Sequence, residues 1–377
     1  MGKPEIRFKG YTDEWEQRKL GDVAQEFKSG NSLKADEIDI TGDYPVYGGN
    51  GLRGYTSNYN HDGEYALIGR QGALCGNMNY SVGKAYFTEH AVVVKAGENN
   101  DTKFLYYMLD TMNLGQYSDQ SAQPGLAVNK LVKLENRFPT KEEQQRIGWY
   151  FSNIDNLITL HQRKCDEVKS LKKYMLQKMF PQNEQKVPEI RFEGFTEAWE
   201  QRKLGDVFKE YSEKNHTELP ALTIIQGGGT VKREESDRNL MYDESNLSNY
   251  KMVRKNDFIV HLRSFEGGLE KSSLDGIISP AYHTFHSDVA DSRFYYPYFR
   301  SHEFIKHKLV PHVYGIRDGR SIDITGMKTI EIPYTSMEEQ RKIGDYLESL
   351  DHLITLHQQK CEELKKIKKF MLQKMFV

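Results

Sequence analysis

Arginine, lysine, asparagine and glutamine side chains gather in the glycine-rich stretches of this 377-residue chain. Arginine can donate two parallel hydrogen bonds to guanine O6 and N7, and asparagine or glutamine can pair with adenine N6 and N7. Candidates in the first half are Arg53, Tyr55, Arg70, Gln71, Asn77, Asn79, Lys84, Gln120 and Gln123. Candidates in the second half are Lys232, Arg233, Arg263, Ser264, His283, Arg317 and Arg320. Each alone is more often an ordinary solvated side chain, so only the two sets together predict contacts with bases and phosphates.

Three near-matches to catalytic or ligand-binding motifs fail at individual positions. The tetrapeptide 279–282 resembles the adenine-methyltransferase motif [DNS]PP[YFW], but Ala281 replaces its second proline and no glycine-rich nucleotide loop precedes it. Gly83 and Lys84 resemble the end of a phosphate-binding loop that lacks its opening glycine and its closing Ser or Thr. No carboxylate lies at the sequence spacing that is typical of a metal site from His302, His307 or His312. We therefore expect no catalytic residue, no metal and no cofactor in this chain.

Composition points to a cytoplasmic protein with enough length for two domains. Cys75, Cys165 and Cys361 form no CxxC pair, which favours a reducing compartment. The sequence shows no signal-peptide pattern and no apolar run near the roughly 20 residues of a membrane span. The formal net charge is −2, so we expect the chain alone to bind DNA weakly, with partner subunits supplying phosphate contacts.

The candidate side chains lie on two inserts carried by a repeated scaffold. Residues 4–23 return as residues 188–207 with about 16 of 20 positions identical. Residues 142–180 return as residues 338–376 with about 25 of 39 identical. The stretches between these blocks barely resemble one another. The resulting divisions are a first globular domain at 1–140, a long helix and linker at 141–186, a second globular domain at 187–335 and a second long helix at 336–377.

The second repeated block predicts a long helix with a heptad seam in each copy. Thr140 with Glu143, and Ser336 with Glu339, have the spacing of capping boxes. Each seam has a lysine at one otherwise apolar position, Lys172 in the first helix and Lys368 in the second. The seam residues expected at the helix-pair interface are Ile147, Phe151, Ile154, Ile158, His161, Cys165, Ile343, Leu347, Leu350, Ile354, His357 and Cys361.

A two-fold relation between the repeats predicts that these helices pair antiparallel within one chain. A parallel homodimeric zipper is the alternative. The antiparallel arrangement brings His161 close to His357. Their contact would set the register, but a simple buried histidine with a backbone or solvent partner is the interpretation we favour.

The inserts are predicted to be mixed α and β domains with a twisted sheet. Strands are expected at 44–47, 65–68, 85–87, 91–95, 222–225, 258–262, 276–278 and 282–285. Helices are expected at 102–112 and 295–309. The fold class is therefore α+β, with each globular domain followed by one long helix.

The whole chain resembles the specificity subunit of type I restriction-modification systems. The resemblance rests on the Trp-Glu-Gln-Arg-Lys-Leu-Gly-Asp segments that begin at Trp15 and Trp199, and on the insert segments 45–51 and 276–282. It extends to the Glu-Gln helix starts at 143–144 and 339–340, followed by Asp155 and Asp351.

The resemblance implies two target-recognition domains, each reading one half of a bipartite, asymmetric site in double-stranded DNA. The paired helices would set the spacing and dock two methyltransferase (M) subunits, with restriction and motor (R) subunits joining for cleavage. S-adenosylmethionine, ATP and Mg would be bound by those partners, and this chain would be non-catalytic. A coiled-coil adaptor for protein or sugar, and a self-sufficient methyltransferase, are the alternatives.

Overall fold

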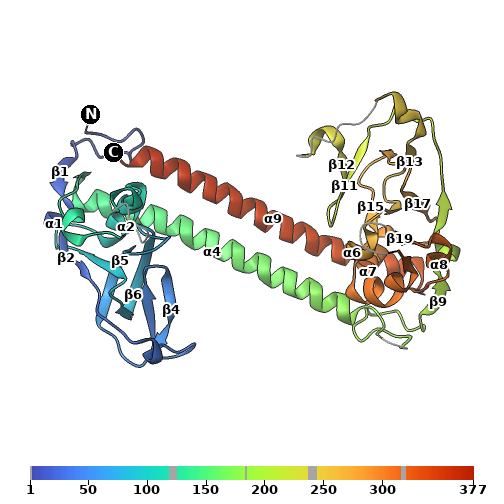
Figure 1. The fold of residues 1–377 in the computed structure, drawn as a ribbon, viewed down its shortest axis with the longest axis horizontal. Helices are drawn as coiled ribbons and strands as arrows, with labels where there is room; N and C mark the ends of the chain where they lie inside the picture. The colour runs from blue at the N-terminus through green and yellow to red at the C-terminus, as the bar shows by residue number, and fades with distance from the viewer. Residues whose placement is uncertain (1, 119–124, 183–184, 237–243, 316–319) are drawn as a thin grey trace. The chain divides into compact units, whose positions relative to one another are not determined.

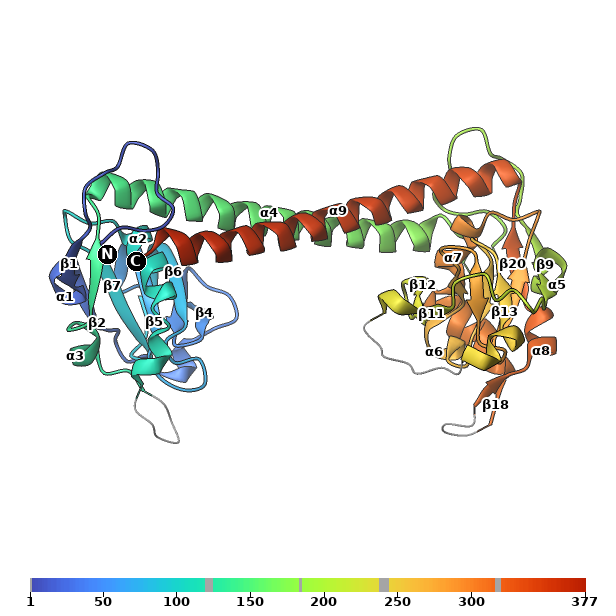
Figure 2. The same cartoon turned by 90° about the horizontal axis from the view of Figure 1, so that it is seen from above.

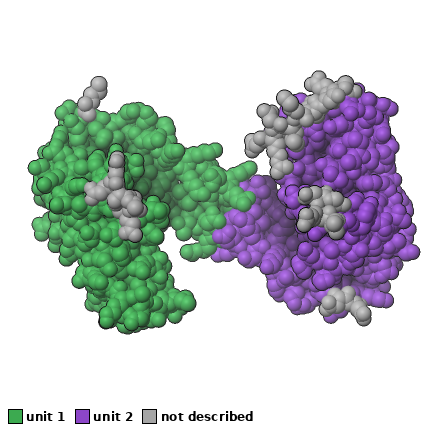
Figure 3. Space-filling view, viewed as in Figure 1, with its two compact units in different colours: residues 1–163, 357–377 green, residues 164–356 purple. Residues whose placement is uncertain are grey.

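The computed structural model describes residues 2–118, 125–182, 185–236, 244–315 and 320–377. They form two compact units: residues 1–163 with 357–377, called unit 1, and residues 164–356, called unit 2 (Figure 3). Helices α4 (Lys141–Lys178) and α9 (Met337–Met375) each contribute residues to both units. Within the described ranges, no helix combines the length and apolarity that a membrane span requires.

Unit 1 is built around a six-stranded sheet of order β2-β7-β5-β6-β3-β4. Neighbouring strands are antiparallel except for the parallel pair β3 and β6. Helix α2 lies against β5, β6 and β7 (Figure 1). The elements before α4 are β1 Glu16–Lys19, α1 Leu20–Val23, β2 Ala24–Ser29, η1 Ala35–Glu37, β3 Tyr44–Gly48, β4 Gly51–Thr56, β5 His61–Gly69, β6 Met78–Phe87, β7 Ala91–Ala96, α2 Thr102–Thr111, η2 Leu114–Tyr117, α3 Val128–Leu131 and β8 Glu135–Phe138.

Unit 2 has a smaller four-stranded sheet of order β10-β17-β14-β15, with the two-stranded pairs β11-β12, β13-β16 and β18-β19. Its elements up to β14 are β9 Glu200–Lys203, α5 Leu204–Val207, β10 Lys209–Tyr211, β11 Leu222–Ile225, β12 Gly229–Lys232, η3 Arg233–Glu235, η4 Glu244–Asn249, β13 Lys251–Val253 and β14 Phe258–Val260. The remainder are α6 Ser264–Gly267, β15 Glu270–Lys271, β16 Gly276–Ile278, β17 His283–His286, α7 Ser292–Phe299, η5 Glu303–Leu309, η6 Val310–His312, β18 Val313–Tyr314, β19 Ser321–Ile322, α8 Ile324–Lys328 and β20 Glu331–Tyr334. The strands predicted from sequence all overlap observed strands, although 258–262 extends two residues beyond β14 and 282–285 begins one residue before β17.

One predicted helix is wrong in its extent. The stretch 295–309 contains the end of α7 and all of η5, separated by residues 300–302. Arg300 ends α7 with backbone angles outside the helical region (φ −107°, ψ 0°). Pro297 within α7 has no N–H to donate, which weakens the helix close to this break.

A two-stranded neck closes each insert in the same way. Strand β1 pairs antiparallel with β8, from Glu16 opposite Phe138, and β9 pairs with β20, from Glu200 opposite Tyr334. The repeated scaffold therefore holds the start and the end of each insert side by side.

Each core joins an insert to both long helices. In unit 1, Trp15 and Phe104 pack with Phe151 near the start of α4 and with Met375 at the end of α9. In unit 2, Trp199 packs with Phe180, which follows α4, and with Leu347 of α9. The aromatic rings lie close, with centroids of Phe180 and Phe294 4.8 Å apart. Burial of these large rings is the main source of stability for each unit.

The two long helices run antiparallel within each unit (Figure 2). In unit 1, Cys361 Sγ donates to Ile158 O at 3.6 Å, and in unit 2 Cys165 Sγ lies 3.9 Å from Ile354 O. The predicted intramolecular antiparallel pairing is therefore confirmed, and the parallel homodimer is wrong. Among the predicted interface residues, the half-buried ones are Ile158, His161, Ile354 and His357, and the other eight are buried.

The seam lysines and histidines make polar contacts between the helices. Lys368 binds Asp155 at 2.7 Å, and Lys172 binds Asp351 at 2.5 Å, so the gaps in the apolar seam are matched salt bridges. His161 Nδ1 and His357 Nδ1 lie 2.9 Å apart. The favoured interpretation of two simple buried histidines is thus wrong, because each imidazole is the other's partner.

The expected capping boxes are replaced by a buried ion pair. Ser336 Oγ accepts from the Glu339 N–H at 3.3 Å, as a cap should. The carboxylates, however, bind arginines from the first repeated block: Glu143 binds Arg7 at 2.7 Å through two nitrogens, and Glu339 binds Arg191 at 2.6 and 2.9 Å. Both carboxylates are almost fully buried. Each ion pair holds the segment before the first strand of its unit, β1 or β9, against the start of a long helix.

Candidate nucleic-acid interface

In unit 1, the turn Gly48–Gly51 between β3 and β4 lies against the end of β5. A Cβ atom at Gly69 would stand 2.4 Å from Gly49 O, and one at Gly49 would stand 2.9 Å from His90 O. Only glycine permits this approach of backbone to backbone. The close packing brings residues from β4, β5, β6 and the β6–β7 turn to one place.

Five polar side chains meet at this turn, and we call them the glycine-turn cluster. The Arg53 Cδ atom approaches Gly48, and the Asn79 amide approaches Gly51. Gln71 Oε1 lies 3.1 Å from His90 Nδ1, and Arg70 Nη1 donates to Glu89 O at 3.3 Å. The members of the cluster are Arg53, Arg70, Gln71, Asn79 and His90.

Buried polar atoms without a protein partner lie beside the same turn. Among the described residues, Asn79 Nδ2, Thr88 Oγ1 and a Glu89 carboxylate oxygen have no hydrogen-bond partner. An unpaired buried polar group costs about 1–3 kcal/mol. The turn therefore carries polar groups whose hydrogen-bonding capacity the described residues leave unused.

The structure separates some candidates from this cluster. Lys84 lies five residues beyond Asn79 on β6, about 17 Å along the strand, with its ammonium 4.6 Å from the Tyr59 ring centroid. Tyr55 lies at the far end of β4, where its backbone bonds to that of Asp39. Asn77, by contrast, stays beside the turn: it is exposed, and its carbonyl oxygen accepts the Gly69 N–H at 2.8 Å. Gln120 and Gln123 lie outside the described residues.

Unit 2 has a different arrangement, which we call the aromatic-arginine cluster. Arg233 Nη1 lies 3.5 Å from the Tyr250 hydroxyl, and the Arg320 guanidinium lies 5.6 Å from the Phe265 ring centroid. The His261 and Tyr282 rings meet edge-to-face, with their centroids 6.1 Å apart. Burial raises the pKa of Tyr282, while the charge of Arg233 opposes that rise. The members are Arg233, Tyr250, His261, Phe265, Tyr282 and Arg320.

Several second-half candidates have other roles. Ser264 is fully buried and its Oγ accepts the His261 N–H at 2.9 Å, so its predicted contact with DNA is wrong and it instead shapes the turn. His283, next to Tyr282 in the chain, binds Glu210 at 2.7 Å. Arg263 and Lys232 are exposed and pair locally with Glu266 and Glu235, and Arg317 lies outside the described residues.

Sequence reasoning missed His90, Tyr250, His261, Phe265 and Tyr282. His90 follows the strand end at Phe87 within a short turn, which was a usable signal. The others come from segments distant in sequence, since Tyr250 precedes β13, His261 and Phe265 follow β14, and Tyr282 precedes β17, so no local pattern predicts that they come together.

His261 provides a pH prediction. Burial, with a smaller contribution from Arg263, lowers its pKa to about 4, against about 6.5 in an unfolded chain. As the pH falls from 6.5 to 4, the unfolded state takes up a proton that the folded state does not, so stability declines. We expect about 1–2 kcal/mol of loss, reduced from the full shift because solvent screens the partly exposed ring.

Urea denaturation of the wild type and of His261→Leu at pH 7 and pH 4.5 tests this expectation. The variant should lose less stability on acidification than the wild type. His352→Leu removes an exposed histidine of unit 2 and is the control. Identical acid sensitivity in the wild type and His261→Leu would contradict the assignment.

A sequence model described as the type I restriction modification DNA specificity domain matches residues 12–170 and 196–366. The chain is 42% identical over 156 residues to the EcoprrI type I restriction enzyme specificity subunit of Escherichia coli, an alignment that spans 40% of this chain and only 39% of that subunit. It is 24% identical to the MjaVIII specificity subunit of Methanocaldococcus jannaschii over 95% of this chain and 91% of that one. The solved S subunit of a type I restriction-modification system from M. genitalium has the same fold, with a TM-score of 0.69 at 16% identity over 100% and 99% of the two chains.

Proposed function

Because this chain belongs to the family of the type I restriction modification DNA specificity domain, which it contains twice, we propose that it is the specificity subunit of such a system. Each unit would read one half of a bipartite, asymmetric DNA site. The observation that supports this most is one repeated scaffold holding two unlike clusters. The glycine-turn cluster offers amide and guanidinium groups suited to base edges, and the aromatic-arginine cluster offers aromatic rings and guanidinium groups.

The outer surface of the helix pair supports docking of two identical partners, which we propose are methyltransferase subunits. Next to the heptad seam, each unit exposes four large apolar side chains at repeat-equivalent positions, each 38–51% exposed. Exposed apolar groups in such a set are typical of protein interfaces. They are Leu157, Leu160, Ile367 and Phe370 in unit 1, and Leu353, Leu356, Leu171 and Tyr174 in unit 2.

We further propose that catalysis belongs to the partner subunits. Methyltransferase subunits would bind S-adenosylmethionine and methylate adenine, and restriction subunits would use ATP and Mg to translocate and cleave DNA. This chain would determine where they act. Among its described residues, no three His, Cys, Asp or Glu side chains are grouped to hold a metal ion.

Exchange of residues 24–138 for the corresponding segment of a relative tests the proposal. Mapping of methylated adenines in a host with the complete system should show a change in one half of the recognised sequence only. Exchange of residues 208–334, which end at the last residue of β20 as 24–138 end at the last residue of β8, is the matched experiment and should change the other half. An unchanged motif, or a change in both halves after one exchange, would refute the proposal.

A further inference from the structure

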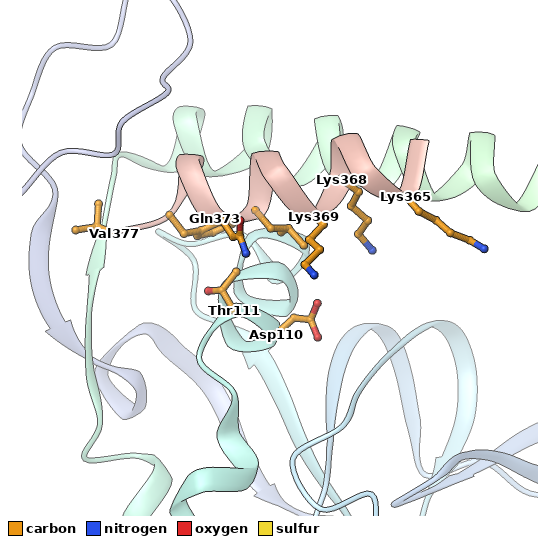
Figure 4. Close-up of a pocket in the computed structure, with 9 residues that line it drawn as sticks. Asp110, Thr111, Lys365, Lys368, Lys369, Gln373 and Val377 are labelled. Atoms are coloured by element: carbon orange, nitrogen blue, oxygen red, sulfur yellow. The ribbon is translucent and has the colours of Figure 1, made fainter. Parts of the chain in front are cut away.

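Equivalent pockets occur in the two units, each between the last turns of a long helix and a helix of the insert. The pocket of unit 1 has a volume of about 540 Å³ and lies between α9 and the end of α2 (Figure 4). The pocket of unit 2 has a volume of about 500 Å³ and lies between α4 and the end of α7. The helix side of the first consists of Lys365, Lys368, Lys369, Leu372, Gln373 and Phe376. The helix side of the second consists of Lys169, Lys172, Lys173, Leu176, Gln177 and Phe180.

Two of the three lysines in each pocket already have carboxylate partners. The middle lysine of each set, Lys368 or Lys172, joins the two long helices through its salt bridge. Lys365 pairs along its own helix with Glu362 at 2.8 Å, and Lys169 lies 3.9 Å from Asp166. For the exposed Lys369 and Lys173, the described part of the chain provides no ion-pair partner. Each pocket therefore presents one uncommitted ammonium group at an equivalent position.

The floor of each pocket is apolar and fixed by the core. The Phe376 ring lies 5.4 Å from Phe104 and 5.8 Å from Phe151 between centroids. Phe180 is buried against Phe294, and Leu372 and Leu176 are half-buried beside the two rings. An apolar floor beneath a cationic rim does not suit a phosphate backbone, which has no apolar group to bury. It suits a protein segment that carries a large apolar side chain next to a carboxylate.

We propose that each pocket binds such a segment, an apolar side chain flanked by Asp or Glu, from the same partner protein. The six shared side chains supply the common contacts, and the remaining walls differ: they include Asp110 and Thr111 in unit 1, and Tyr298, Ser301, His302 and Glu303 in unit 2. Two equivalent pockets in one chain bind two copies of one partner. The inference rests on the proposed function, which makes that partner the methyltransferase subunit, and it assigns to the partner an acidic and apolar contact segment.

The test uses the full chain, co-expressed with the cognate methyltransferase subunit, and charge reversal of the uncommitted lysines. Native mass spectrometry should show two methyltransferase subunits per wild-type chain. Lys369→Glu and Lys173→Glu should each weaken one of the two binding events at least tenfold, and the double variant should weaken both. Lys369→Arg keeps the charge and should bind as the wild type does. Lys366→Glu, at an exposed position outside the pocket lining, is the matched control.

The outcomes separate this inference from the proposed function. If the wild type binds two methyltransferase subunits and the double variant does too with unchanged affinity, the pocket assignment is overturned and the function stands. If the variants assemble normally but the complex loses DNA affinity with a shallower salt dependence, the pockets bind phosphates and the inference is again wrong. A wild-type chain that binds no methyltransferase subunit overturns both.

Discussion

Replacement of Glu339 by alanine is expected to destabilise unit 2 by about 3–5 kcal/mol, because it leaves the charge of Arg191 buried without a partner. The carboxylate also accepts hydrogen bonds from Trp199 Nε1 at 3.1 Å and from the Thr335 hydroxyl. Those two donors lose their acceptor in the same variant. Hydrogen exchange measured by mass spectrometry on the full chain resolves the two units by peptide and should show faster exchange throughout unit 2.

The repeat supplies a matched comparison for this prediction. Of the three donors that Glu339 has in unit 2, Glu143 keeps only the equivalent arginine, Arg7. Pro139 occupies the position of Thr335 and has no hydroxyl, and the Trp15 indole N–H has no hydrogen-bond partner among the described residues. Glu143→Ala should therefore cost unit 1 less than Glu339→Ala costs unit 2. The paired change Arg191→Leu with Glu339→Leu should be milder than Glu339→Ala, because it leaves no lone charge. Equal costs in the two units, or a cost below about 1 kcal/mol, would show that the extra donors of Glu339 contribute little.

Gly69→Ala is expected to abolish recognition of one half of the DNA site while the other half is retained. Its Cβ atom would lie 2.4 Å from Gly49 O and 2.6 Å from Leu74 O, and Gly49 cannot withdraw without moving the end of β3 or the start of β4. The turn Gly48–Gly51 would shift, and with it Arg53 and Asn79. Displaced contacts at one half-site should raise the Kd of the assembled complex for its DNA at least about tenfold, or about 1.4 kcal/mol.

Gly125→Ala is the control for this change, because the nearest atom to its added Cβ is Arg70 O at an ordinary 3.9 Å. Binding is measured at a fixed salt concentration with DNA changed in either half-site. The Gly69→Ala complex should no longer distinguish changes in one half and should still distinguish changes in the other. Full discrimination in both halves would show that the glycine turn does not position base-reading groups.

The long helices and most strands follow from the sequence because their signals are local and repeated. The heptad seam is long enough to predict both the helices and their pairing, and the antiparallel arrangement follows from the repeat. The break between α7 and η5 was missed because the apolar pattern of 295–309 continues across residues 300–302. The order of strands in the six-stranded sheet depends on contacts distant in sequence, which periodicity does not report.

The candidate site was predicted less completely than the fold. Residues flanking glycine turns, such as Arg53, Arg70 and Asn79, do converge, since glycine allows strand ends to approach. Ser264 was misplaced because sequence does not distinguish a turn serine that faces solvent from one that faces the backbone of His261. The ion pairs of Arg7 and Arg191 were also missed, although the two repeated blocks carried both partners twice.

The pairing of β1 with β8 and of β9 with β20 has an evolutionary consequence. At each neck the polypeptide leaves and returns about 4.8 Å apart, the distance between adjacent strands. A foreign module needs only to match that narrow gap to be grafted by recombination without disturbing the helices. If either neck can accept any of the available insert domains, the number of distinct chains grows as the square of the number of insert domains.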